Sequence, residues 1–219
     1  PTHRKPVKTG AIFSEKNESV SMQIINDTSA MIPEPCVATI GFFDGVHMGH
    51  RYLIQQVKEI AAAKGLHSAL VTFPVHPRKV MNAAYHPELL TTPEEKTNLL
   101  AGTGVDYCLM LDFTPDISRL TAKEFMTQIL KERYQVKYLV IGYDHRFGHN
   151  RSEGFDDYVR YGQAIGIEVI RAQAYTDDIQ IDTIQSAPIS SSLIRKLLHQ
   201  GDVDAAARCL GYEYFLDGT

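Results

Sequence analysis

The chain carries at residues 39–50 the stretch Thr39-Ile40-Gly41-Phe42-Phe43-Asp44-Gly45-Val46-His47-Met48-Gly49-His50, which joins two regular patterns. The run that leads into it, CVATI at residues 36–40, is short, apolar and rich in β-formers, as expected for a parallel strand covered on both faces. Asp44-Gly45 then breaks the strand. From Arg51 onward, apolar residues recur on one helical face as far as Gly65, a natural helix stop. The order of strand, glycine-rich turn and helix predicts an α/β fold.

The start of this predicted helix has the properties of a phosphate-binding site. Unpaired N–H groups point out of a helix N-terminus, and the helix dipole favours an anion there. Gly45 and Gly49 allow the backbone to approach a ligand closely. His47 and His50, three residues apart, can direct both imidazoles at one cluster of phosphate oxygens. A neutral imidazole donates one hydrogen bond and a protonated one adds charge, so both forms suit a phosphorus centre that gains negative charge.

Two other interpretations of the His47-Met48-Gly49-His50 tetrapeptide stay open on the residues alone. It can be an ordinary capped turn with a structural role. It can also contribute to a zinc site, but such a site needs at least one further ligand, and no Cys/His cluster stands at typical spacing in the sequence.

A second helix start is predicted in residues 185–198, QSAPISSSLIRKLL. The three consecutive hydroxyl residues at 190–192 precede an apolar-periodic run, which is a helix N-cap pattern. Arg195 falls one turn into that helix, where its guanidinium can reach the same phosphate chain. The alternative is an ordinary cap followed by a solvent-exposed arginine.

The rest of the chain alternates between predicted strands and helices. We expect strands at residues 67–73, 105–111, 136–141 and 167–172, a helix that begins at Pro93 after a Thr92 cap, and helices at 121–133, 155–165 and 201–210. This alternation predicts a Rossmann-like parallel sheet with helices on both faces, and ligands bound outside the carboxyl ends of the strands. Asp144 follows the strand at 136–141 and would face the same crevice as His47, or cap the turn before Gly148.

Four motifs together carry a family resemblance: residues 41–50, the FPVHP turn at 73–77, the GYDHRFG loop at 142–148, and residues 189–195. Over residues 36–208 the chain resembles the N-terminal adenylyltransferase module of prokaryotic bifunctional FAD synthetase (riboflavin kinase/FMN adenylyltransferase), of the HxGH nucleotidyltransferase type. Two positions depart from the family pattern. Val75 stands where an acidic residue is usual, and His145 where an aromatic residue is usual. Both departures fall on the flavin side, and the triphosphate side matches the pattern.

The resemblance implies that the chain transfers AMP from ATP to FMN, giving FAD and pyrophosphate. The FMN phosphate would attack the α-phosphorus of ATP in line, so the protein need not supply a nucleophile. Mg²⁺ would be carried mainly by ATP rather than by a protein cage. Asp44 would lie near the triphosphate through magnesium and water, or would only form the turn.

We expect the site residues to fall into three groups. The catalytic group is His47, His50, Arg195 and Asp144. ATP contacts are expected from Gly41, Phe42, Phe43, Asp44, Gly45, Gly49, Ser190, Ser191 and Ser192. Flavin contacts are expected from Phe73, His76, Pro77 and Phe147, with Phe73 and Phe147 alternatively part of the core.

Other functions stay open beside this one. The same fold can use another phosphate acceptor, such as pantetheine phosphate or nicotinamide mononucleotide, and the chain can also be a non-catalytic flavin-binding or nucleotide-binding module. A class I aminoacyl-tRNA synthetase shares the histidine motif, but the chain lacks the length and the basic surface that tRNA requires.

Composition limits the class of protein further. With 219 residues, 44% hydrophobic and 22% charged, the chain has an ordinary globular composition, and its net charge of −4 argues against a general nucleic-acid surface. Three cysteines, far apart and odd in number, predict buried thiols in a reducing cytoplasm. The sequence has no apolar run of membrane-spanning length and no signal-peptide pattern.

We expect three parts along the chain. Residues 1–21 are predicted to be a tag remnant or a disordered extension, and residues 22–209 the FMN adenylyltransferase domain. Residues 210–219 resemble the start of the family's riboflavin kinase domain, truncated here. That C-terminal domain is the partner expected in the full-length protein, so we do not expect riboflavin kinase activity of this chain.

Overall fold

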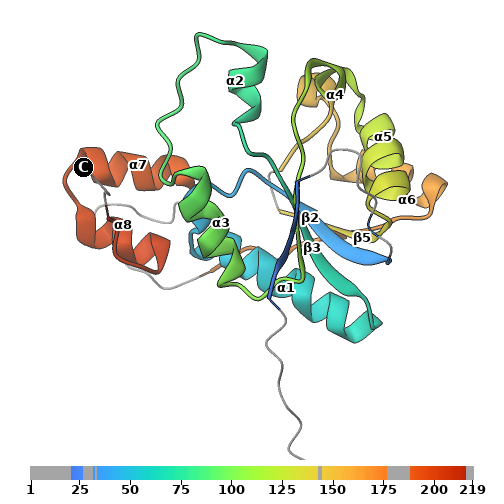
Figure 1. Ribbon diagram of the computed structural model, residues 1–219, viewed down its shortest axis with the longest axis horizontal. Coiled ribbons are helices and arrows are strands. Elements are labelled where there is room, and N and C mark those ends of the chain that lie inside the picture. Colours follow the sequence, from blue (N-terminus) through green and yellow to red (C-terminus); the bar gives the residue numbers. More distant parts are fainter. Residues whose placement is uncertain (1–20, 27–31, 33, 143–144, 177–187, 216–219) are drawn as a thin grey trace, which may run out of the picture.

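The computed structural model describes residues 21–26, 32, 34–142, 145–176 and 188–215. At its centre is a parallel sheet with the strand order β1-β4-β3-β2-β5-β6 (Figure 1). The strands are β1 (Gln23–Ile25), β2 (Cys36–Ile40), β3 (His67–Thr72), β4 (Tyr107–Met110), β5 (Val136–Ile141) and β6 (Glu168–Arg171). The predicted α/β fold class is therefore confirmed.

The helices fall where capping signals place them. They are α1 (Met48–Lys64), α2 (Pro77–Met81), α3 (Pro93–Ala101), α4 (Pro115–Arg119), α5 (Ala122–Glu124), α6 (Phe155–Ile165), α7 (Ser191–His199) and α8 (Val203–Leu210), with 3-10 turns η1 (Asp44–Val46) and η3 (His149–Arg151) and the π-helical η2 (Phe125–Arg133). Thr92 and Glu95 form a capping box at α3, and Gly65 ends α1 in the left-handed conformation. Both caps match the sequence prediction.

The expected elements differ from the observed ones in a few places. The strands at 36–40 and 136–141 and the helix at 155–165 have the predicted bounds, and the other predicted strands differ by one or two residues. β1 was not predicted, because three residues are too few to produce a readable alternation. The helix predicted at 121–133 is α5 continued by η2, since hydrogen bonds to the fifth residue back replace the α pattern after the first turn.

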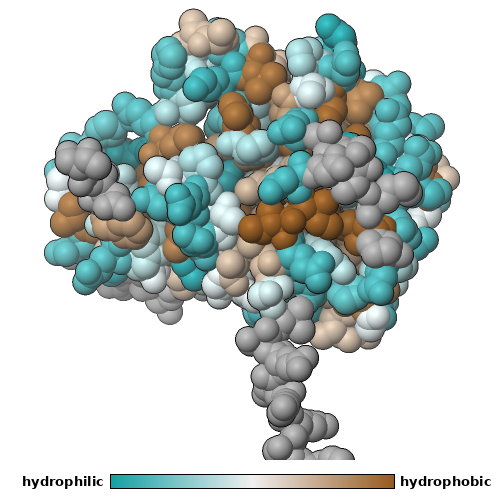
Figure 2. All heavy atoms as spheres, viewed as in Figure 1, coloured by the Kyte–Doolittle hydropathy of each residue, from teal (hydrophilic) through white to brown (hydrophobic). Residues whose placement is uncertain are grey.

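Helices cover both faces of the sheet (Figure 1). On one face, apolar residues of α1 and α3 pack against β2, β3 and β4, and on the other face η2 and α6 pack against the same sheet. Large apolar side chains that stay exposed include Val75, Val80 and Met81, and Figure 2 shows brown surface where Figure 1 places α2. None of the helices in the described ranges is long and apolar enough to cross a membrane.

Helices α7 and α8 form a small unit beside α3. Their buried faces pack on each other and on Leu90, in a cluster separate from the two faces of the sheet. Figure 1 shows this pair to the side of the sheet. The segment around Leu90 therefore joins the C-terminal helices to the main domain.

The sheet order places a crevice at the carboxyl end of β2. The chain runs from β2 to β3 and β4 on one side, then returns to β5 and β6 on the other side. Ligands in open parallel sheets bind where the strand order reverses in this way. The turns after β2, β3 and β5 consequently meet at one edge.

The cysteines lie inside the fold, as predicted. Cys36, Cys108 and Cys209 are buried free thiols. Burial raises the pKa of Cys36 to about 12 and the pKa of Cys108 to about 11. These two thiols are therefore protonated at neutral pH and unreactive.

Packing of α6 against β6 predicts a sensitive position at Gly162. A Cβ at this position would overlap the carbonyl oxygen of Ile167, which is backbone and cannot move freely. We expect Gly162→Ala to lower the free energy of unfolding by about 2 kcal/mol. Gly102→Ala is the matched control, because its Cβ would meet ordinary contacts at 3.4 Å. Urea denaturation of both variants measures this, and equal stabilities would contradict the packing described.

Candidate functional site

The turn after β2 holds backbone angles that L-residues seldom adopt. φ is +56° at Phe43, +76° at Gly45 and +37° at Val46. A β-branched residue such as Val46 disfavours positive φ, so contacts from outside must hold this turn. A Cβ on Gly41 would lie 2.9 Å from the Phe43 ring, so this ring position requires glycine there. The strained turn ends at His47, at the start of α1.

His47 caps α1 and His50 lies in its first turn. His47 Nδ1 accepts a hydrogen bond from the backbone N–H of His50 at 3.3 Å, and the two rings stack with centroids 3.6 Å apart. Because Nδ1 is the acceptor, neutral His47 carries its proton on Nε2 and can donate it to a ligand. Burial lowers the pKa of His47 to about 4 and the pKa of His50 well below its ordinary value. Both imidazoles are therefore neutral at physiological pH.

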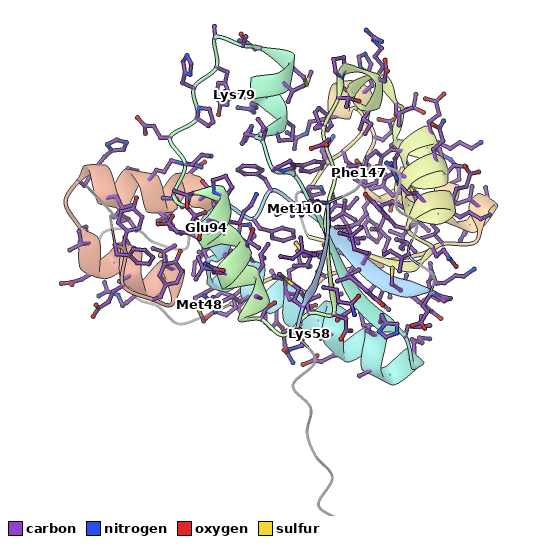
Figure 3. The ribbon with its side chains drawn as sticks, viewed as in Figure 1. Met48, Lys58, Lys79, Glu94, Met110 and Phe147 are labelled. Atoms are coloured by element: carbon purple, nitrogen blue, oxygen red, sulfur yellow. The ribbon has the colours of Figure 1, made fainter. Side chains whose placement is uncertain are left out.

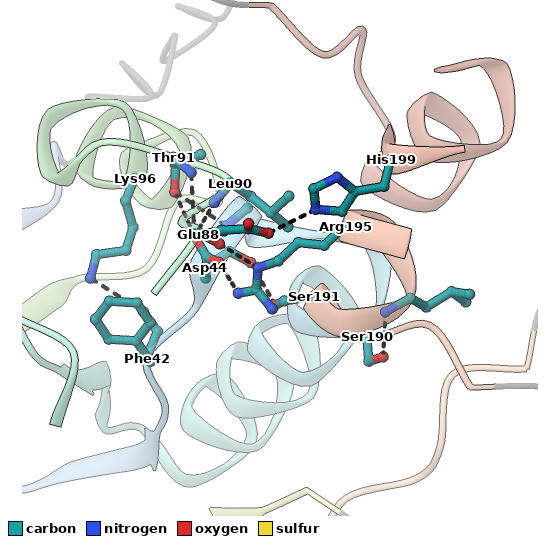
Figure 4. A network of polar contacts seen from close by, with 12 residues as sticks. Phe42, Asp44, Glu88, Leu90, Thr91, Lys96, Ser190, Ser191, Arg195 and His199 are labelled. Carbon is teal, nitrogen blue, oxygen red and sulfur yellow. Dashed lines mark hydrogen bonds and ion pairs between the residues drawn. The ribbon is translucent and has the colours of Figure 1, made fainter. Parts of the chain in front are cut away.

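Asp44 connects this turn to two distant parts of the chain (Figure 4). Its carboxylate is buried; Oδ1 accepts from the backbone N–H of Leu90 at 2.9 Å and of Thr91 at 3.3 Å. Oδ2 accepts from the guanidinium of Arg195 at 2.5 Å. Arg195 also donates through Nε to the carbonyl of Glu88. The two predicted site residues Asp44 and Arg195 are thus brought together as an ion pair.

The N-terminus of α7 lies against the N-terminus of α1. Ser190 caps α7 with its side chain, and Ser191 Oγ donates to the carbonyl of Asp44 at 2.9 Å. A Cβ on Gly49 would lie 3.5 Å from the carbonyl oxygen of Ile189, an ordinary contact distance that places the two segments side by side. Two helix N-termini, each with unpaired N–H groups, therefore meet at the carboxyl edge of the sheet.

Beside this pair lies the turn after β3. His76 caps α2, whose first residue is Pro77, and the His76 ring meets the Phe42 ring edge-on with centroids 4.7 Å apart. Phe73 is 8% exposed and packs edge-on against Phe113 in the core. The predicted flavin-side residues His76 and Pro77 thus reach this edge, and Phe73 supports them from inside.

The segment after β5 approaches the histidine turn from the other side. Phe147 is partly buried and stacks on Tyr158 with centroids 4.3 Å apart, and its backbone N–H donates to the Tyr158 hydroxyl. Burial, and after it the neighbouring His47 and His145, lower the pKa of His50, so the segment that carries His145 lies near the histidines. Asp144 lies outside the described residues.

Two residues at this edge were missed by the sequence analysis. Lys96 of α3 is buried and donates from Nζ to the carbonyls of Phe42 and Phe73. The Tyr212 hydroxyl donates to the carbonyl of Gly45 at 2.7 Å. The sequence did contain a sign that Lys96 is buried, because it lies four residues before Leu100 on the apolar face of a predicted helix. Tyr212 carried no comparable signal.

A separate hollow lies at the opposite, amino end of the sheet. It has a volume of about 620 Å³ and is lined by Pro35, Lys64, Leu66, Lys137, Tyr138, Gly162, Gln163, Gly166, Ile167 and Glu168. None of the predicted site residues lines it. The chemistry expected from the sequence is therefore at the carboxyl edge.

Comparisons with known proteins show what this chain is similar to. Residues 29–188 match the family model of FAD synthetase. A bifunctional riboflavin kinase/FMN adenylyltransferase of Listeria monocytogenes is 35% identical over 184 residues, 84% of this chain and 56% of that protein. The protein of the same name from Escherichia coli is 32% identical over 194 residues, 89% of this chain and 60% of that protein.

A solved structure shares the fold. The crystal structure of a protein from Streptococcus pneumoniae, named there a macrolide-efflux protein, aligns with a TM-score of 0.73 and 28% identity over 86% of this chain and 60% of that chain. The chain thus spans a little over half of the length of the relatives it matches.

The buried ion pair of Asp44 and Arg195 should stabilise the protein more than an exposed pair does. We expect Asp44→Asn to lower the free energy of unfolding by about 2–3 kcal/mol, because it leaves a partly buried guanidinium without its carboxylate. The matched control is Asp116→Asn, which removes the exposed pair with Arg119. Thermal denaturation should leave the control unchanged. An equal effect of both substitutions would show that the Asp44 pair is not a structural clamp.

The low pKa of His47 predicts an acid-sensitive fold. Between pH 6.5 and about 4 the unfolded chain binds a proton at this position and the folded chain does not, so stability falls as the pH falls. The shift corresponds to on the order of 3 kcal/mol. We expect His47→Asn, which keeps a capping side chain, to lose less stability than the parent between pH 7 and 4. Denaturation at both pH values, with the exposed His86→Asn as control, measures this, and identical acid losses would be evidence against a neutral His47.

Proposed function

This chain belongs to the FAD synthetase family, and from that membership we propose that it is an FMN adenylyltransferase that transfers AMP from ATP to FMN. Its curated relatives are named for this activity and for riboflavin kinase, and the chain spans 56–60% of the length of the two relatives above. Of these two activities, we propose the adenylyltransferase for the part of the relatives that this chain matches. Buried thiols suit a reducing compartment, so we place the reaction in the cytoplasm.

The observation that carries the proposal is the meeting of two helix N-termini. The starts of α1 and α7 lie side by side, tied by Ser191 and by the Asp44–Arg195 pair. A polyphosphate needs several N–H donors and at least one cation that converge on one place. The edge of this sheet supplies both, with His47 and His50 at the same place.

In this mechanism the substrates supply the reacting groups. An oxygen of the FMN phosphate attacks the α-phosphorus of ATP and forms a new P–O bond, while the bond from that phosphorus to the β-phosphate oxygen breaks and pyrophosphate leaves. The protein contributes orientation and charge stabilisation. His47 would donate from Nε2 to the phosphate oxygens, and His50 and Arg195 would stabilise the negative charge of the transition state and the leaving group. Asp144 would orient the acceptor.

The ATP contacts proposed here surround the same edge. They are Gly41, Phe42, Phe43, Asp44, Gly45, Gly49, Ser190, Ser191 and Ser192. Asp44 acts in this proposal through its hydrogen bonds, because N–H donors already occupy both of its carboxylate oxygens. Flavin contacts are proposed for His76 and Pro77 in the turn after β3, for Phe73 before it, and for Phe147 in the segment after β5.

Mg²⁺ enters this proposal with the nucleotide. Among the described residues no group of three or more His, Cys, Asp or Glu side chains could hold a metal ion. In this proposal the ion belongs to the substrate and neutralises the β- and γ-phosphates of ATP.

Replacement of His50 tests the proposed function. We expect the purified chain with ATP, Mg²⁺ and FMN to form FAD, detected by chromatography, and His50→Ala to lose about 10²–10³ in turnover because one donor to the transition state is gone. The exposed His86→Ala is the matched control and should keep full turnover.

Three results would contradict the proposal. Turnover of His50→Ala close to that of the parent would remove the role of this histidine. No FAD from the parent chain, together with tight ATP or FMN binding, would indicate a binding module. Pyrophosphate release with pantetheine phosphate or nicotinamide mononucleotide in place of FMN would identify another acceptor.

A further inference from the structure

Lys96 is a buried cation with no carboxylate bonded to it in the described parts of the chain. The residue is 2% exposed, and Nζ donates to the carbonyl oxygen of Phe73 at 2.8 Å and of Phe42 at 3.2 Å. Figure 4 shows the Lys96 side chain reaching from α3 toward Phe42. A buried charge held only by neutral carbonyls is costly, so its presence calls for a reason beyond stability.

The contacts of Lys96 link two turns at the carboxyl edge. Phe42 follows β2 and Phe73 follows β3, and Nζ bonds the carbonyls of both. Nζ also lies 4.1 Å from the centre of the Phe42 ring, which meets the His76 ring in an edge-on arrangement. The Phe42 carbonyl accepts a second bond from Thr72 Oγ1 at 3.3 Å. Lys96 therefore joins the turn of the proposed nucleotide contact Phe42 to the turn of the proposed flavin contacts.

The charged and titratable groups around Lys96 leave its charge unneutralised. Asp44 in η1 acts on it from a distance, but both Asp44 oxygens already accept bonds from other donors. Cys108 in β4 faces it with a thiol that burial keeps protonated. Burial lowers the pKa of His76 in the turn after β3, and the charges of Arg78, Arg195 and, to a smaller extent, Lys96 lower it further. Burial lowers the pKa of Lys96 itself to about 8, so it is mostly charged at pH 7.

We propose that Lys96 is a positioning residue that selects the phosphorylated acceptor, because it fixes the turns after β2 and β3 and places a positive charge beneath them. This inference rests on the proposed function. The ammonium is too deeply buried to touch the substrate, so it acts through the field of its charge and through the Phe42 and Phe73 carbonyls that it holds. A phosphate monoester is favoured over the uncharged alcohol in such a field.

Lys96→Met keeps the volume of the side chain and removes its charge and its hydrogen bonds. We expect KM for FMN to rise about tenfold and KM for ATP to rise less, since Phe42 is one of several proposed nucleotide contacts and the two helix N-termini are untouched. Lys58→Met is the matched control. Lys58 also donates to a backbone carbonyl, that of Thr103, and Figure 3 places Lys58 at the opposite side of the view from Lys79 of α2. The control should keep both KM values.

Binding without turnover gives a second readout. Quenching of flavin fluorescence should show that the parent chain binds FMN several-fold more tightly than riboflavin. Lys96→Met should reduce this preference, because it weakens the binding of FMN and leaves the binding of riboflavin unchanged. In the parent chain the FMN preference should decrease between pH 7 and pH 9, as Lys96 loses its proton. Because the pH experiment uses the parent chain, it tests the role of Lys96 even if the variant does not fold.

The outcomes separate this inference from the proposed function. If the parent chain forms FAD but Lys96→Met leaves KM for FMN and the FMN preference unchanged, Lys96 has no positioning role. An equal rise of KM for ATP and FMN would also overturn the inference, since it indicates general loss of structure. If the parent chain forms no FAD, the proposed function fails, and the preference for FMN over riboflavin still tests Lys96.

Discussion

The carboxylate of Asp44 is the contact on which the geometry of this site depends. It accepts bonds from the segment at Leu90 and Thr91 and from Arg195, so it joins the turn after β2 to the unit formed by α7 and α8. The turn itself contains positive φ angles at Phe43 and Val46, which the local sequence would not adopt unaided. The buried ion pair thus supplies the outside contact that this strained turn needs, and in doing so it brings two helix N-termini together.

Neutral and charged polar side chains both lie at this edge of the sheet. His47 is buried and His50 is partly buried, and both imidazoles are neutral, so they do not repel each other or Arg195. The positive charge of Arg195 is partly neutralised by Asp44. The positive charge of Lys96 has no bonded carboxylate among the described residues. In the proposed function, neutral donors lie on the nucleotide side and a fixed cation lies under the acceptor side. This arrangement suits a reaction between two phosphates, because their negative charge is present before the reaction and is only redistributed by it.

The sequence predicted the parts of this account that depend on local pattern. The apolar run at β2, the hydroxyls before α7 and the Thr92 cap of α3 each have a local cause, and the family resemblance carried by four motifs is confirmed by the family match. The ion pair between Asp44 and Arg195 spans most of the chain, and no local pattern specifies it. β1 is too short to be read from its own residues, and Lys96 was hidden because a lysine on a helix is ordinarily solvated. The roles of the site residues stay proposals.

The central claim is that two phosphates react at the meeting point of α1 and α7. In the most direct test, the purified chain is incubated with FMN and ATP in two parallel reactions. The ATP carries a label at the α-phosphate in one reaction and at the γ-phosphate in the other, and the label is followed into flavin and pyrophosphate. An adenylyltransferase puts the α label into FAD and the γ label into pyrophosphate. Label from the γ-phosphate in the flavin product, or no label in any flavin, would contradict the account.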